Sequence, residues 1–120
     1  MTRHCLIGGL CAVLLAGCAP SPEELRDKAI AEFQLGRLDK AEDFIEQALS
    51  RDPAMPEALY YLGRIRHAQG FQEQAIYYYQ CALDADPKCY PAQRWLEKAE
   101  QETGTTGPRL QFIPVSPEGR

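Results

Sequence analysis

Hydrophobic residues in the middle of the chain recur at the spacing of α-helices, in two successive pairs of segments. Leu25, Ala29 and Phe33 share one face of a first predicted helix, because residues four apart are neighbours on a helical surface. A second stripe follows Gly36, and both stripes recur further along the chain. The pattern therefore predicts four amphipathic helices. The remaining stripe positions are Leu38, Ala41, Ile45 and Ala48, then Leu59, Leu62 and Gly63, then Ala75, Tyr79 and Ala82.

Residues that begin and end helices flank these stripes. Residues 21–24 read Ser-Pro-Glu-Glu, in which Ser21 is the predicted N-cap and Glu24 completes a capping box. Gly36 and Gly70 follow the first helix of each pair, and glycine readily adopts the left-handed backbone that commonly ends a helix. The helix boundaries are therefore indicated by chemistry as well as by periodicity.

The two pairs of segments repeat one another at a period of 34 residues. Gly36 recurs as Gly70, and Asp52-Pro53 recurs as Asp86-Pro87. This period and these residues resemble the tetratricopeptide repeat, in which each repeat is a helix-turn-helix unit. The resemblance implies a right-handed α-solenoid that covers residues 22–103. Further matches at the same period are Leu25 with Leu59, Ala41 with Ala75, Ala48 with Ala82 and Leu49 with Leu83.

We expect an all-α fold with two tetratricopeptide repeats, residues 22–55 and 56–89, and one further helix. The further helix, residues 90–103, begins near Pro91 and resembles the polar capping helix that solvates the end of such an array. Two repeats are fewer than the three that stability generally needs, so self-association or docking on a partner is expected. Three charged residues stand where the resembled family usually buries apolar side chains: Lys28, Glu32 and Arg66.

The first residues have the order of a bacterial export signal. A short basic head precedes an apolar stretch, Leu6 to Ala16, which is too short to span a bilayer as a mature helix. Residues 15–18 read Leu-Ala-Gly-Cys and resemble a lipobox. The resemblance implies that residues 1–17 are a lipoprotein signal peptide and that Cys18 is acylated, for example with palmitate. The alternatives are a plain signal peptide with an incidental Cys18, or an uncleaved N-terminal anchor.

A short tether, residues 18–21, would join the acylated cysteine to the first helix. Three extended residues cover about 10 Å, so the helical module should lie almost against the membrane. Ala19 follows Cys18, which resembles lipoproteins sorted to the outer membrane and facing the periplasm. In a bacterium with one membrane, the same anchor implies the cell surface.

Charge and composition narrow the possible functions. The chain of 120 residues carries 13 Lys and Arg against 17 Asp and Glu, a net charge of −4. No long basic run occurs in the sequence, so a nucleic-acid partner is not expected. The sequence also lacks the H-E-x-x-H and C-x-x-C spacings of metal and redox sites. We therefore predict a protein that is not an enzyme and needs no metal or cofactor beyond its lipid.

In the resembled family, the first helix of each repeat lines a concave face that holds peptides. Here this implies a groove of cationic and aromatic side chains, with Arg64 at its centre. Such a groove suits an extended peptide with acidic side chains or a free carboxylate. The alternatives are solvated basic residues with partners one turn away, and a Phe33 that belongs to the core. The predicted groove residues are Arg26, Phe33, Tyr60, Arg64, His67, Arg94 and Lys98, with Glu42 and other acidic residues on the outer side.

Two further features concern cysteine and tyrosine. Cys81 and Cys89 would remain beside Cys18 after signal cleavage; they form either a disulfide or two thiols, one buried and one exposed. Tyrosines cluster at residues 60–61 and 77–79. We expect one of each cluster, Tyr79 in the second, to pack inside, while the others serve either inter-repeat packing or a partner.

The composition changes abruptly at residues 104–120, where glycine and proline forbid a long helix. This segment is either a frayed tail or a short linear motif that docks in extended form. We predict that the whole chain is a lipid-anchored protein-interaction module, an adaptor or assembly factor of an envelope complex. The alternative is a permanent structural subunit whose small core is completed by its partner.

Overall fold

The computed structural model describes residues 19–104, and this part of the chain contains helices and no strands. The expected all-α solenoid of helix-turn-helix units is confirmed. The predicted signal peptide, the acylation site Cys18 and residues 105–120 of the tail lie outside the described residues. Within residues 19–104, each helix is too short or too polar to cross a membrane. The helices are α2 (Pro22–Gln34), α3 (Leu38–Arg51), α4 (Pro56–Ala68), α5 (Gln72–Ala85) and α6 (Tyr90–Thr103).

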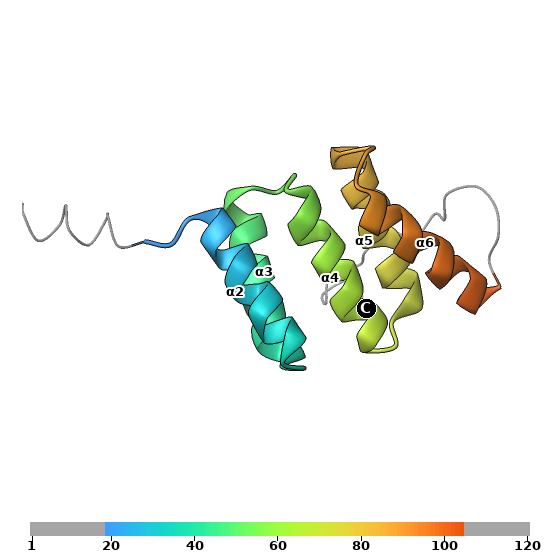
Figure 1. Cartoon of the computed structure of the whole chain (residues 1–120), viewed down its shortest axis with the longest axis horizontal. Coiled ribbons are helices and arrows are strands. Elements are labelled where there is room, and N and C mark those ends of the chain that lie inside the picture. The colour runs from blue at the N-terminus through green and yellow to red at the C-terminus, as the bar shows by residue number, and fades with distance from the viewer. Residues whose placement is uncertain (1–18, 105–120) are drawn as a thin grey trace, which may run out of the picture.

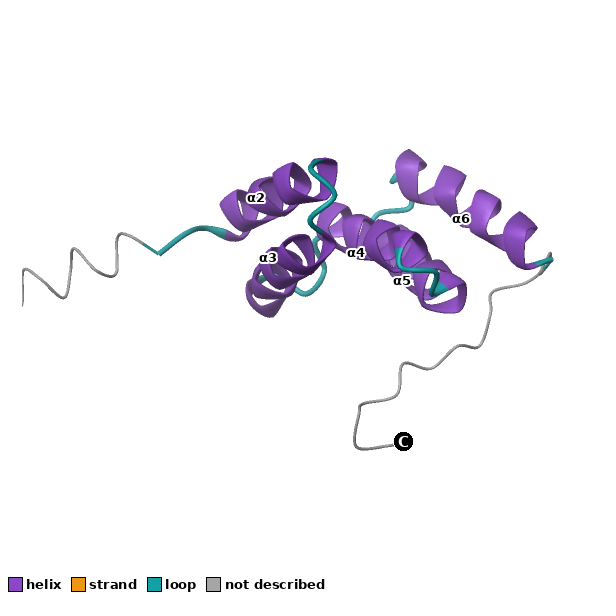
Figure 2. Ribbon diagram, turned by 90° about the horizontal axis from the view of Figure 1, so that it is seen from below, coloured by secondary structure: helices purple, strands orange, loops and turns teal. Residues whose placement is uncertain are grey.

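The helices form two antiparallel hairpins and one closing helix (Figure 1). In the first hairpin α2 packs against α3, in the second α4 packs against α5, and α6 packs mainly against α5. Figure 2 shows α2 and α6 on one side of α3 and α5, and α4 lies between α2 and α6 and contacts both. The first helix of each hairpin and the closing helix therefore share a face, as the family resemblance implies.

The predicted helix ends are present. The Ser21 hydroxyl accepts from the Glu24 backbone N–H at 3.2 Å, and the Glu24 carboxylate accepts from the Ser21 N–H at 2.8 Å. These reciprocal bonds satisfy two N–H groups that a helix start leaves without partners. Gly36, Gly70 and Gly104 have φ angles of 77°, 88° and 71°, which residues with a side chain resist.

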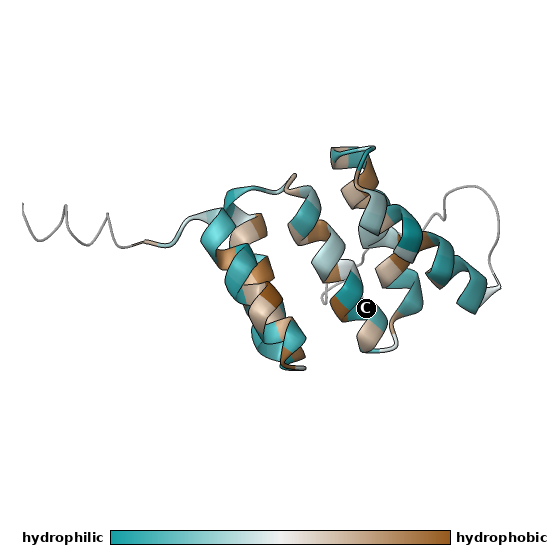
Figure 3. Cartoon of the chain, viewed as in Figure 1, coloured by the Kyte–Doolittle hydropathy of each residue, from teal (hydrophilic) through white to brown (hydrophobic). Residues whose placement is uncertain are grey.

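The core follows the predicted stripes. Hydrophobic and hydrophilic residues alternate around each helix (Figure 3), and the apolar faces meet in two clusters that share partly buried side chains, including Leu49 and Tyr78. The hydrophobic core is therefore continuous through both hairpins. Tyr79 is fully buried, as predicted. The stripes missed four buried apolar residues: Met55 on the turn before α4, Ala58 and Ile65 beside Leu62 on α4, and Ile76 on α5.

Arg66 stands where the family usually has an aromatic residue, and it joins the two hairpins. Its guanidinium donates to both carboxylate oxygens of Glu42 on α3, at 3.0 and 2.6 Å, and to Gln69 at 2.9 Å. Burial opposes ionisation of Glu42, but the bonds and charge of Arg66 hold the pKa of this carboxyl below its ordinary value. Glu42, expected on the outer face, instead lies half-buried at the junction between the hairpins.

Candidate functional site

Arg64, in the middle of α4, is surrounded by aromatic rings from three helices. Its guanidinium carbon lies 3.7 Å from the ring centroid of Trp95 on α6, 5.1 Å from that of Phe33 on α2 and 5.8 Å from that of Tyr60. Arg64 also donates to the Tyr60 hydroxyl at 2.8 Å. Three predicted groove residues are thus brought together, and the rings hold the guanidinium in place through cation–π contacts.

A second cation shares the same indole. The Lys98 ammonium lies 4.8 Å from the Trp95 ring centroid, so α6 contributes both the platform and a positive charge. Among residues 19–104, neither Arg64 nor Lys98 is in an ion pair, whereas Arg26, Arg37 and Arg66 each lie within 4.0 Å of a carboxylate oxygen. The centre of the groove therefore holds two cations without a directly paired carboxylate in residues 19–104, although the Lys98 charge helps to lower the pKa of Glu102.

His67 is committed to internal contacts. Its Nε2 lies 2.6 Å from the Glu102 carboxylate on α6 and its Nδ1 lies 3.3 Å from the Tyr79 hydroxyl on α5. The imidazole with its proton on Nε2 fits both partners, because Nε2 then donates and Nδ1 accepts. The bond from His67 lowers the pKa of Glu102. Both ring nitrogens of His67 are thus engaged within the protein and hold α6 in position, and its membership of the peptide-binding groove stays a prediction.

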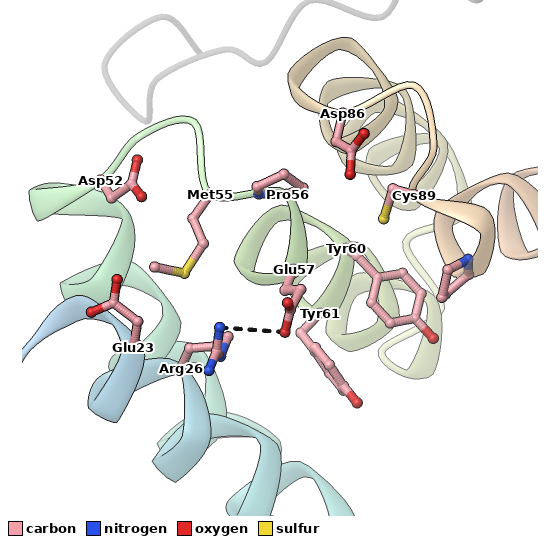
Figure 4. A pocket seen from close by; sticks show the side chains of 11 residues that line it. Glu23, Arg26, Asp52, Met55, Pro56, Glu57, Tyr60, Tyr61, Asp86 and Cys89 are labelled. Carbon is pink, nitrogen blue, oxygen red and sulfur yellow. Dashed lines mark ion pairs between the residues drawn. The ribbon is translucent and has the colours of Figure 1, made fainter.

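Arg26 lies at the other end of the groove in an acidic environment. It contacts Asp27 at 2.8 Å and Glu57 at 3.4 Å, and the hydrogen bond that it donates to the Asp27 carboxylate raises its pKa. Arg26 lines a hollow of about 540 Å³ between α2, α4 and α6, shown in Figure 4. Arg26 differs from Arg64 in that carboxylates pair with its charge, and its place in the peptide-binding groove stays a prediction. The carboxylates that line the hollow are Glu23, Asp52, Glu57 and Asp86.

Arg94 does not take part in the contacts between Arg64 and its surrounding aromatic rings. It is exposed on α6, and among residues 19–104 it has no ion pair, ring contact or hydrogen bond. Sequence reasoning instead missed Trp95 and Tyr61 as groove residues. The Tyr61 ring packs edge-on to Phe33 at 5.7 Å and to Tyr60 at 4.9 Å. The available signal for Trp95 was its position one turn before Lys98 on the same helix.

The structure holds Cys81 and Cys89 as two thiols, so the possible disulfide between them is corrected. The two side chains line different hollows: Cys81 lies beside Tyr77 on α5, and Cys89 faces the acidic hollow beside Tyr60. A disulfide needs both side chains to point at each other across a short distance. Cys89 is buried, and burial raises its pKa, which disfavours the reactive thiolate.

Metal-binding groups are not assembled in residues 19–104. No three His, Cys, Asp or Glu side chains in this part lie close enough together to hold an ion. The four carboxylates of the hollow are thus spread around its walls. Their arrangement suits contact with a larger ligand more than coordination of one small ion.

The sequence matches the model of one protein family, the tetratricopeptide repeat, over residues 26–88. This range covers just over half of the 120-residue chain and spans α3, α4 and α5 entirely. No curated protein matches the sequence. The matched range includes Arg64 and the acidic side chains of the hollow except Glu23.

Proposed function

Because the chain belongs to the tetratricopeptide repeat family and is a protein-interaction module, we propose that it binds an extended peptide of a partner along the face formed by α2, α4 and α6. The peptide would present a carboxylate, from Asp, Glu or a chain end, to Arg64 and Lys98. Binding of this kind involves no chemical reaction and no cofactor.

The observation that supports this proposal is the state of Arg64. A guanidinium has five N–H donors, and within residues 19–104 one hydrogen bond of Arg64 is described, to Tyr60. Stacking against Trp95 at 3.7 Å keeps the group rigid and partly dry. A rigid guanidinium loses little entropy when it pairs with a carboxylate in two parallel bonds. The Arg64 guanidinium is therefore preorganised to bind a carboxylate of a partner peptide.

The proposed location is the bacterial envelope, with Cys18 as a lipid anchor. Support comes from the sequence alone: a basic head, an apolar stretch of residues 6–16 and the Leu-Ala-Gly-Cys segment. The tether to α2 is short, and Arg51 of α3 donates to the Pro20 carbonyl, which ties the tether to the first hairpin. We propose an adaptor or assembly factor held beside the membrane, in the outer membrane where the source has one.

A second candidate is a permanent structural subunit. The observation that favours it is apolar exposure at the turns: Leu35 is 65% exposed and Phe71 is 51% exposed, so a partner could extend the core there. A permanent subunit should be unfolded when the mature chain is made without its lipid and its partner, whereas an adaptor should fold by itself. Circular dichroism and a thermal melt of that chain separate the two.

The central test of the groove is Arg64→Glu. Reversal of this charge should weaken capture of acidic peptides about tenfold or more, because an anion then meets a like charge. Arg64→Lys should retain part of the binding, since it keeps the charge and loses the paired geometry. The measurement is pull-down from a detergent extract of membranes, followed by peptide binding by calorimetry.

The matched control is Lys40→Glu, which makes the same charge change at an exposed position on α3. Glu42 is unsuitable for this purpose because it bonds Arg66. Unchanged partners for Arg64→Glu, together with a loss of partners for Tyr77→Ala or for a chain that ends at residue 104, would place the binding surface on the convex face or in the tail.

A further inference from the structure

The groove has a second end, at the start of α2, α4 and α6, and its chemistry differs from that around Arg64. Here a hollow of about 540 Å³ is lined by apolar groups from Met55, Tyr60, Tyr61 and Pro91 as well as by carboxylates. Figure 4 shows the side chains of Tyr60, Tyr61 and Glu57 together on α4. An aliphatic stem of a long side chain would find apolar walls in this hollow.

The charge of the hollow is negative. Four carboxylates line it against one guanidinium, Arg26, a formal charge of −3. Asp52 and Asp86 each use one oxygen to accept a backbone N–H in their turns, at 3.3 and 3.0 Å, and within residues 19–104 neither is in an ion pair. Glu23 is exposed and has no ion pair among residues 19–104. Arg26 therefore does not cancel the field of the hollow.

Tyr60 connects the two ends of the groove. Its ring lines the acidic hollow, and its hydroxyl accepts from Arg64 at 2.8 Å. Glu57 and Arg64 lie seven residues apart on α4, so their backbone positions differ by roughly 10 Å along the axis. An extended peptide advances about 3.3 Å per residue. Groups that meet the two ends would therefore lie about three residues apart in a bound peptide.

We propose that the groove selects a peptide with charges of both signs: an acidic group at Arg64 and Lys98, and a Lys or Arg side chain about three residues away that enters the acidic hollow. This inference rests on the proposed function and adds the second half of the partner's recognition sequence. Complementary charge at both ends fixes the direction in which the peptide lies, because the reversed peptide places like charges together.

The experiment compares three short peptides on the full mature chain. The first carries Asp and Lys three residues apart, the second replaces Lys by norleucine, and the third replaces Asp by Asn; each is made in both residue orders. Norleucine keeps the aliphatic stem and removes the charge. Binding is measured by calorimetry and by fluorescence of Trp95, the one tryptophan in the chain, which touches Arg64.

The protein variant is the double substitution Glu23→Gln and Asp86→Asn. Asn at residue 86 still accepts the turn hydrogen bond, so the fold is preserved while two charges are removed. The matched control is Asp43→Asn with Glu97→Gln, which removes two exposed charges outside the hollow. In the better residue order, the norleucine peptide should bind the wild type about fivefold more weakly than the lysine peptide. This ratio should fall below about twofold in the hollow variant and stay unchanged in the control.

Equal binding of the lysine and norleucine peptides by the wild type, with weaker binding of the Asn peptide, would overturn the proposal and leave the proposed function standing. Equal binding of all three peptides would overturn both. A lysine peptide that still binds the hollow variant about fivefold more tightly than the norleucine peptide would show that the lysine side chain contacts another surface, and would overturn the proposal.

Discussion

At the scale of single residues, Gly63 shows how closely α4 and α5 approach. A side-chain carbon built at this position would lie 2.5 Å from Cε1 and 2.6 Å from Cδ1 of Tyr79. The Tyr79 ring is fully buried, so it has no open space into which it can move. Glycine at this position is therefore required by packing, although glycine in a helix interior is otherwise unfavourable.

We predict that Gly63→Ala lowers the free energy of unfolding by about 1–2 kcal/mol. Overpacking of a tight core costs about 1–3 kcal/mol, and the better helix propensity of alanine returns less than about 1 kcal/mol of it. Urea unfolding followed by circular dichroism measures the change. Gly36→Ala is the comparison, because its position has a φ of 77° and open space around it. Gly36→Asn should be nearly neutral while Gly63→Asn should be severe; equal effects would contradict the packing explanation.

At the scale of elements, the two hairpins are joined by charge as well as by apolar contact. The ion pair of Arg66 with Glu42 has side-chain exposures of 18% and 20%, so solvent screens it only in part. Glu46, one turn further along α3, has a raised pKa because burial and the nearby Glu42 carboxylate disfavour its charge. The junction between repeats therefore depends on which of these carboxyls is ionised.

We predict that Glu42→Gln destabilises the fold by about 1–3 kcal/mol near neutral pH, since it leaves the Arg66 guanidinium without its charged partner. The folded pKa of Glu42 lies below its ordinary value of 4.5. Its contribution is therefore complete above that value and is lost as the pH falls through the lower folded pKa. Unfolding free energies of wild type and variant, measured from pH 7 to pH 3, should converge at the acid end. Parallel curves would contradict this assignment.

The closing helix α6 is more than a polar cover for the end of the array. The Glu102 carboxylate on α6 is bonded to His67 on α4. It also accepts a hydrogen bond from the Gln72 side chain on α5 at 3.1 Å. These bonds set the position of α6, which carries Trp95 and Lys98 toward Arg64. The helix that the repeat pattern predicts as a solvating cap therefore also completes the groove.

At the scale of the whole molecule, the chain enters the fold at the same end as the acidic hollow. The start of α2 and the turns before α4 and α6 lie together at one end of the helices (Figure 1), and the hollow is lined by residues from all three. With Cys18 acylated, this end of the groove would lie nearest the membrane. A partner peptide would then enter with its cationic group directed toward the lipid surface.

We predict that Cys18→Ala abolishes acylation and leaves the precursor unprocessed, because the thiol that carries the lipid is gone. Mass spectrometry of the N-terminal peptide and fractionation after a high-salt wash check this outcome. Cys89→Ala, which removes a different thiol, should still yield a membrane-bound, acylated protein. A mature Cys18→Ala protein that stays tightly bound to membranes would show that residues 15–18 are not a lipobox.

The sequence alone determined the helical elements and their order. The apolar stripes, the capping box at Ser21 and the glycines at 36 and 70 act within one or two turns, so their local pattern is sufficient to place the helices. The resemblance to the tetratricopeptide repeat, carried by the period of 34 residues, then implied the stacked hairpins and the face shared by their first helices. Tyr79 could be assigned to the core for the same reason, since it lies on the apolar stripe of its helix between Ala75 and Ala82.

Only the tertiary structure decided which charges remain available on that face. Arg26 meets Glu57, Arg66 meets Glu42 and His67 meets Glu102; the last two pairs lie 24 and 35 positions apart in the sequence. A helical pattern gives the face of each residue but not the crossing angles and side-chain rotamers that bring two helices to bonding distance. Arg64 has no ion pair within residues 19–104 because aromatic rings, and not carboxylates, surround it when α2, α4 and α6 are packed together.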